Sequence, residues 1–166
     1  MPNWCENDLI ISCDDPAIFQ SFVEMSGIAT DTFLFNNIRP MPEKLRSIST
    51  GGICIDGVQY THWYEKPGAE PVGITADEMD ELYHEYGASN WYDWCCKYWG
   101  CKWDVQYADV CGLSYDENEA RLHFETPWGP PEELYDYIRL HFPEIRMNWF
   151  YKEEGMQIAG WLGVEQ

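Results

Sequence analysis

Basic residues are scarce in this sequence of 166 residues. It holds 10 lysines and arginines against 29 aspartates and glutamates, which gives a formal net charge of −19 and a pI near 4.3. Proteins bind nucleic acids and membrane surfaces largely by neutralising phosphates with lysine and arginine, so we expect no direct contact with either. The 45% of hydrophobic residues are ample for a core, and we expect one folded domain spanning 1–166.

Long apolar runs are also missing. No stretch approaches the roughly 18 apolar residues of a membrane span, and the N-terminus, Met1-Pro2-Asn3-Trp4-Cys5-Glu6, lacks the basic and apolar regions of a secretion signal. These absences predict a cytosolic protein. In that compartment the seven cysteines are interpreted as thiols rather than disulfides.

Catalytic signatures are absent as well. There is no G-x-S-x-G, H-E-x-x-H, Walker or G-x-G-x-x-G motif, and the histidines fall in no local nucleophile signature. We therefore predict a protein that is not an enzyme and has no cofactor. An enzyme would need a histidine that meets a cysteine or a carboxylate within hydrogen-bond reach.

A zinc site is a weak alternative. Cys95, Cys96 and Cys101, with His84 and Cys111, could supply ligands, but the paired C-x2-4-C knuckles of structural zinc sites are missing. Buried thiols that pack as small apolar groups are the simpler interpretation. The sequence predicts no metal and leaves open whether the four cysteines bind one.

The two ends of the chain show a regular order of elements. Apolar spacing and turn residues predict a β-α unit, then two hairpins with a helix between them. The middle, 28–102, is rich in Pro and Gly, with one predicted hairpin and two helices capped by Thr75 and Ser89. The predicted elements are strands at 8–12, 103–110, 120–126, 145–151 and 156–162, helices at 16–26 and 130–142, and the hairpin at 53–64.

Four motifs are recognisable in the residues themselves. They are Met1-Pro2-Asn3-Trp4-Cys5 with Asn7; Trp91-x-x-Trp94-Cys95-x-x-x-Trp99-Gly100-x-Lys102-Trp103-Asp104; Thr126-Pro127-Trp128-Gly129-Pro130-Pro131; and Tyr151-x-Glu153-x-Gly155. Together they resemble the signatures of the Api92-like, or YubB, ferredoxin-like family. The resemblance implies an α+β fold: a ferredoxin-like antiparallel sheet with two packing helices and a long helical and loop insertion at about 28–102. It also implies a phage or plasmid protein in the cytoplasm of a bacterial host, and it supplies no catalytic residue.

The tryptophans allow two interpretations. Trp91, Trp94, Trp99, Trp103 and Trp128 could line a ligand cleft, but platforms that stack nucleobases come with a basic groove, which this stretch lacks. We expect them to be mainly core aromatics. A small-ligand or structural module that uses a Trp-lined cleft remains the alternative function.

The strongest functional candidate is the acidic segment 70–85. It holds six acids and no Lys or Arg, and like charges at helical spacing destabilise the helix that carries them. A solvated face is the simpler explanation for any one cluster. We nevertheless predict that a basic host protein, part of a nucleic-acid-binding defence complex, binds here and is inhibited, as by an anti-CRISPR or anti-restriction protein or a DNA mimic. The predicted binding residues are Asp77, Glu78, Asp80, Glu81 and Glu85.

Overall fold

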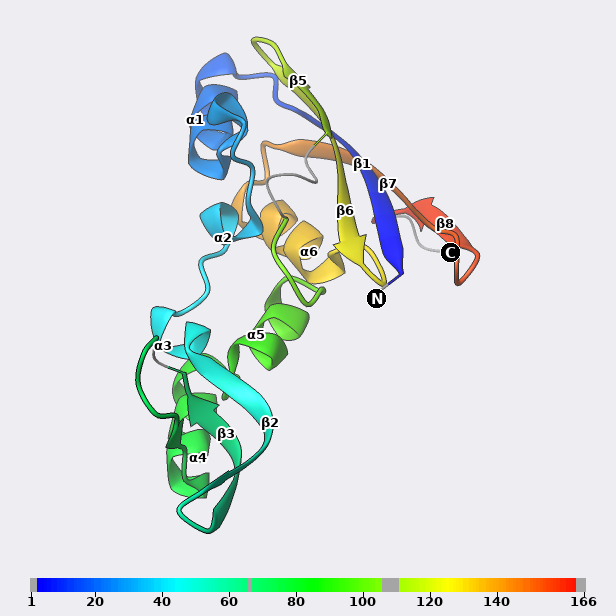
Figure 1. The fold of residues 1–166 in the computed structure, drawn as a ribbon. Coiled ribbons are helices and arrows are strands. Elements are labelled where there is room, and N and C mark those ends of the chain that lie inside the picture. The colour runs from blue at the N-terminus through cyan, green and yellow to red at the C-terminus, as the bar shows by residue number, and fades with distance from the viewer. Residues whose placement is uncertain (1–2, 66, 106–110, 164–166) are drawn as a thin grey trace. The chain divides into compact units, whose positions relative to one another are not determined.

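A nine-residue strand, β1 (Trp4–Ser12), lies at the centre of a five-stranded antiparallel sheet. Cys5, Asn7, Leu9 and Ile11 are buried, and the residues between them face the other, open side. The strands follow the order β5-β6-β1-β7-β8, so β1 pairs with β6 on one edge and β7 on the other (Figure 1). The remaining strands are β5 (Cys111–Tyr115), β6 (Glu119–Pro127), β7 (Arg146–Glu153) and β8 (Ile158–Trp161).

Two helices, α1 (Pro16–Ser26) and α6 (Glu132–His141), lie on the buried side of this sheet (Figure 1). The Asp15 side chain caps α1 by accepting from the backbone of Ala17 and Ile18, as its position before Pro16 predicts. The order β1-α1-β5-β6-α6-β7 and the two packing helices confirm the predicted α+β arrangement. Two short turns, η1 (Ile28–Thr30) and α2 (Phe35–Ile38), follow α1.

This computed structural model describes residues 3–65, 67–105 and 111–163, and the chain divides into two units. The first comprises residues 1–40 and 98–166, and the second comprises 41–97. The second unit is narrower than the predicted insertion, because 28–40 and 98–102 pack within the first. Trp99 Nε1, for example, donates to the backbone oxygen of Arg39 at 2.9 Å. That the whole chain is one domain stays a prediction.

The second unit combines a small sheet with three helices. The predicted hairpin at 53–64 is confirmed, with its turn at Asp56-Gly57. The sidechain of Asn90, not Ser89, caps α5 by accepting from the backbone of Asp93 at 2.9 Å. The elements are α3 (Glu43–Arg46), β2 (Ile48–Ile55), β3 (Val58–Tyr64), β4 (Val72–Gly73), α4 (Ala76–Tyr86) and α5 (Trp91–Tyr98).

The strand predicted at 103–110 is wrong in its described part. Residues 103–105 form no strand, 106–110 lie outside the described residues, and the partner of β6 is β5. The alternating pattern predicted a strand wrongly because the Asp104 carboxylate accepts hydrogen bonds within a loop. Its donors are the backbone N–H groups of Phe35 at 2.6 Å, Asn36 at 3.0 Å and Val105 at 2.8 Å. Asp104 thereby satisfies the first N–H groups of α2.

Candidate partner-binding surface

Helix α4 begins with a reciprocal hydrogen-bond arrangement. The hydroxyl of Thr75 accepts from the backbone of Glu78 at 3.3 Å, and the Glu78 carboxylate accepts from the Thr75 backbone and hydroxyl, both at 2.8 Å. This capping box fixes the start of the helix. The two hydrogen bonds from Thr75 lower the pKa of Glu78 from its usual value. Glu78, predicted as a partner contact, therefore also has a structural task.

The other acids of α4 are exposed. Asp77, Glu81 and Glu85 are one turn apart on one side of the helix, and Asp80 flanks them, while Leu82 is 2% exposed and turns to the core. Within the part of the chain that the structure describes, no Lys or Arg forms an ion pair with any of the four. Glu85 interacts with its neighbour Tyr86 and raises the pKa of that phenol. These four acids, which we call the acidic stripe, thus form a solvated surface whose negative charge is not compensated by an ion pair within the described residues.

An aromatic ring lies beside this acidic stripe. Tyr83, which helical spacing placed in the core, is 60% exposed. Lys97 Nζ lies 5.2 Å from the centre of its ring and donates to the backbone oxygen of Gly87 at 2.8 Å. Tyrosines are frequent anchors in protein interfaces, so Tyr83, which sequence reasoning assigned to packing, is a further candidate contact residue.

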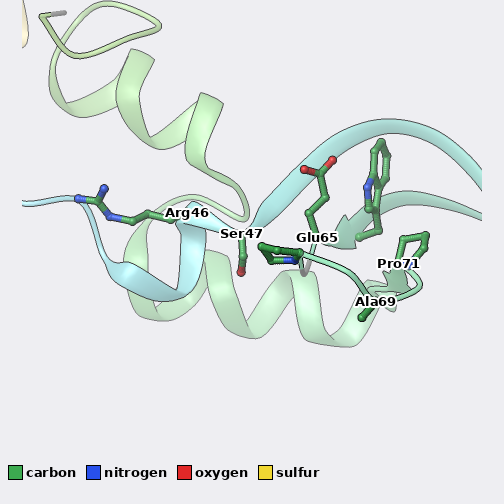
Figure 2. A pocket seen from close by; sticks show the side chains of 7 residues that line it. Arg46, Ser47, Glu65, Ala69 and Pro71 are labelled. Carbon is green, nitrogen blue, oxygen red and sulfur yellow. The ribbon is translucent and has the colours of Figure 1, made fainter.

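A pocket of about 520 Å³ opens elsewhere on the second unit (Figure 2). Its two charged groups have opposite signs, and Arg46 is already paired with Glu43 at 3.0 Å. Among the described residues of its lining, the pocket therefore shows no net preference for an anion or a cation. Its lining residues are Arg46, Ser47, Trp63, Glu65, Pro67, Ala69 and Pro71.

The predicted aromatic residues divide between core and surface. Trp94 and Trp99 are 5% and 3% exposed and pack as core residues, and Trp91 is partly buried. Trp128 is 44% exposed. It lies with the partly buried Trp103 on the surface of the first unit.

A third indole joins that surface. The rings of Trp4 and Trp103 are 6.4 Å apart, and Trp4 is 39% exposed. The ammonium of Lys102 lies 4.3 Å from the ring centre of Trp103 and 5.8 Å from that of Trp128. The three indoles and this lysine form a mixed aromatic and cationic patch, which we call the indole patch.

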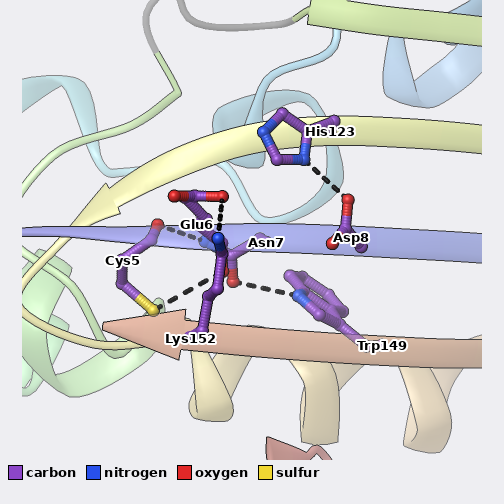
Figure 3. Close-up of polar contacts among 7 residues, drawn as sticks. All are labelled: Cys5, Glu6, Asn7, Asp8, His123, Trp149 and Lys152. Carbon is purple, nitrogen blue, oxygen red and sulfur yellow. Dashed lines mark hydrogen bonds and ion pairs between the residues drawn. The ribbon is translucent and has the colours of Figure 1, made fainter. Parts of the chain in front are cut away.

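Several motif residues hold the first unit together instead of forming a site. Asn7 is fully buried, and its amide donates to Thr126 Oγ1 at 2.8 Å. The amide also donates to the Cys5 oxygen at 2.9 Å, and it accepts from Trp149 Nε1 at 3.0 Å (Figure 3). Glu153, 2% exposed, accepts from the backbone of Gly155 and Met156 in the turn before β8. These motif positions are explained by buried hydrogen bonding.

A histidine and a carboxylate do meet on the open face of the sheet. His123 on β6 and Asp8 on β1 are directly opposed, with Nδ1 and Oδ1 2.6 Å apart (Figure 3). Among the side chains that the structure describes, none with a nucleophilic group is hydrogen bonded to His123. We interpret the contact as a cross-strand pair that matches the Lys152–Glu6 ion pair of 2.9 Å beside it.

The cysteines do not assemble in the described part of the chain. Cys95 and Cys101 are buried, Cys96 is partly buried, and the side chain of Cys111 lies outside what the structure describes. No group of three or more potential metal ligands occurs among the described residues. Burial raises the pKa of the Cys5 thiol to about 11. In the same residues, no helix has the length and apolar character needed to span a membrane.

Comparison with protein-family models supports the resemblance over the last part of the chain. A family model described as the ferredoxin-like domain in Api92-like protein matches residues 99–165. The crystal structure of a protein Api92 from Yersinia pseudotuberculosis is similar at 14% identity, covering 97% of this chain and 93% of that chain, with a TM-score of 0.43. No curated protein matches. The antiparallel sheet with two packing helices agrees with a ferredoxin-like domain, and residues 99–165 are similar to the domain of this kind that is described in Api92-like protein.

Proposed function

We propose that the protein works by binding a basic protein through the exposed acids of α4, and that it catalyses no reaction of its own. The observation that carries the proposal is the stripe of Asp77, Asp80, Glu81 and Glu85, which no Lys or Arg of the described residues neutralises. Carboxylates in this state attract lysine and arginine at long range. Association with a basic surface is therefore fast and strongly dependent on salt.

The partner we propose is a nucleic-acid-binding defence protein of a bacterial host. From Asp77 to Glu85 the helix rises about 12 Å, and it carries five acids over that length, about one charge per 2.4 Å. Duplex DNA carries one charge per ~1.7 Å of axis, so α4 approaches the charge density that a DNA-binding groove is built to accept. The protein would then be an anti-CRISPR or anti-restriction inhibitor encoded by a phage or plasmid and acting in the host cytoplasm.

Charge reversal tests this proposal. The protein would be used to capture partners from lysates of bacteria that carry defence systems, and the captured protein would be purified for affinity measurements at several salt concentrations. A variant with Asp77→Lys, Glu81→Lys and Glu85→Lys should bind at least about 30-fold more weakly at low salt, because each of the three reversed contacts costs roughly threefold or more. Raising the salt should weaken the native complex steeply.

The matched control changes the net charge equally at residues outside α4. It carries Glu24→Lys, Glu117→Lys and Glu154→Lys, three exposed acids of the first unit. This variant should lose no more than a few-fold in affinity through the weaker overall field. Equal losses in both variants, or a complex that ignores salt, would refute a specific role for α4.

The indole patch favours a second candidate function, a small-ligand or structural binding module. Exposed indoles that converge on one surface are unusual, because tryptophan is normally among the most buried residues on average. Trp128→Ala should then abolish binding of the ligand, whereas Trp161→Ala, at an exposed indole on β8, should not. If the captured partner still binds the Trp128→Ala variant but does not bind the variant with reversed charges on α4, the result favours the first proposal.

A further inference from the structure

A second hollow of the molecule lies within the first unit, and it differs in character from the pocket of Figure 2. Its volume is about 290 Å³, and it is lined mostly by apolar side chains from α1 and from the segment that follows α6. The lining residues are Ile18, Ser21, Phe22, Met25, Phe142, Glu144 and Ile145. We call it the α1 pocket.

The floor of the α1 pocket is buried and its rim is exposed. Phe22 and Ile145 are each 4% exposed, and the rings of Phe22 and Phe142 meet edge to face at 5.2 Å. Ile18 at the rim is 39% exposed. Met25 completes the wall with a flexible thioether that adapts to the shape of what it contacts. Apolar surface is thus held open to solvent, where an apolar ligand would cover it.

The volume sets the size of that ligand. An apolar cavity of about 150 Å³ accommodates benzene, so a pocket of about 290 Å³ has room for one indole or phenyl ring with a short chain. The lining residues are mostly apolar and offer few groups for hydrogen bonds with a ligand. The hydroxyl of Ser21, one of its polar groups, already donates to the backbone oxygen of Ala17 at 2.9 Å.

The rim sets the charge of the ligand. Glu144 is exposed at the pocket, and within the described residues no base pairs with it. The nearby base Arg146 is paired through both guanidinium nitrogens with Asp14. A ligand in the pocket therefore meets one carboxylate, in a protein of net charge −19. Both favour a cation and disfavour an anion.

We propose that the α1 pocket binds a small arylalkylamine: an aromatic ring that lies between Phe22, Met25 and Phe142, with an ammonium group two or three bonds from the ring that reaches Glu144. This inference does not rest on the proposed function, because α4 belongs to the other unit. Reversal of the α4 acids should leave amine binding unchanged, so that each proposal can fail alone.

The test uses tryptamine and its acidic counterpart indole-3-propionate, which share a ring and differ in the sign of the charge. The full-length protein, labelled with ¹³C at methionine methyl groups, is titrated and the Met25 signal is followed by NMR. Tryptamine should shift this signal saturably. Indole-3-propionate should bind at least about tenfold more weakly, because its carboxylate would face Glu144.

Two pairs of variants locate the site. Glu144→Gln should weaken tryptamine binding about fivefold or more, whereas Glu24→Gln, an acid of α1 outside the pocket, should have no effect. Ser21→Phe fills the pocket from an exposed helix position and should abolish binding, and Gln20→Phe controls for an added ring on α1. Amide spectra confirm that each variant is folded.

Three outcomes of the titrations with tryptamine and indole-3-propionate would overturn the proposal. They are a Met25 signal that does not saturate with tryptamine, equal affinity for the acid and the amine, and full affinity in Glu144→Gln. Binding of a peptide with adjacent Trp and Lys residues in the absence of tryptamine binding would also overturn it, because it would assign the pocket to a protein partner.

Discussion

The buried hydrogen bond between Asn7 and Trp149 should be measurable as a coupling energy. Replacing Asn7 with Leu keeps a similar volume but removes the acceptor of Trp149 Nε1, 3.0 Å away, on a ring that is 0% exposed. A buried donor without a partner costs about 1–3 kcal/mol. The loss is partly offset because leucine itself gains from burial. We expect Asn7→Leu to lower the unfolding free energy of the first unit by about 2 kcal/mol.

The double variant reveals the hydrogen bond itself. In Trp149→Phe the buried N–H disappears, so adding Asn7→Leu no longer leaves that donor unsatisfied. The double variant should therefore be more stable than the sum of the single losses predicts, by about 1–2 kcal/mol. Thr126 keeps its hydrogen bond to the oxygen of Gly129 at 2.7 Å in every variant, which limits side effects.

Hydrogen exchange of the β1 amides is the suitable assay, because it reports the opening free energy of the first unit separately from that of the second. Trp161→Phe supplies the control, since this 49% exposed ring makes no hydrogen bond with Asn7. Asn7→Leu combined with Trp161→Phe should be additive. Additivity within about 0.5 kcal/mol in the cycle with Trp149 would refute the reasoning.

Two further predictions concern helix α4 and the thiols. Thr75→Ala should lower the stability of α4 by about 1 kcal/mol, as measured by exchange of its amides. Because Thr75 lowers the pKa of Glu78 in the folded state, the stability from this pair is present above the ordinary glutamate pKa and is lost as the pH falls through the lowered one. Glu78→Gln should therefore reduce the difference in α4 protection between pH 7 and pH 3, and an unchanged difference would contradict the capping box. At pH 8 the exposed Cys54 should react with iodoacetamide within minutes, whereas the buried Cys5, with its pKa of about 11, should react only on unfolding; mass spectrometry that found equal labelling would refute this assignment.

The sequence predicted the helices and most strands of the first unit because the signals that mark them are local. Asp15 before Pro16 marks the start of α1, and alternation of apolar residues marks β6. The motifs pointed to the ferredoxin-like arrangement without showing why the residues are there. That Asn7 hydrogen-bonds Trp149, 142 positions away, depends on strand register, which no local pattern contains.

The errors arose where a side chain had a partner far away in the sequence. The alternation at 103–110 predicted a strand, but Asp104 instead holds the backbone of Phe35 and Asn36, 69 and 68 positions away. Helical spacing placed Tyr83 in the core, but Tyr83 is 60% exposed, whereas its neighbour Leu82 is 2% exposed. Periodicity gives the apolar side of a helix but not how much of it the neighbouring sheet covers.

The carboxylates of this acidic chain can be separated by what they do for the fold. Asp15, Asp104 and Glu153 each accept backbone hydrogen bonds, at a helix start, a loop and a turn, so their replacement would be felt as lost stability. Glu81 lies beyond the first turn of α4, accepts no such hydrogen bond within the described residues, and is repelled by Asp77 and Glu85 one turn away on either side. A carboxylate that does not stabilise the fold can be favoured only by its effect on solubility or on binding. These two benefits differ in dependence on position: solubility follows the total charge, whereas binding follows the place of each charge, so moving the same charges off α4 separates them.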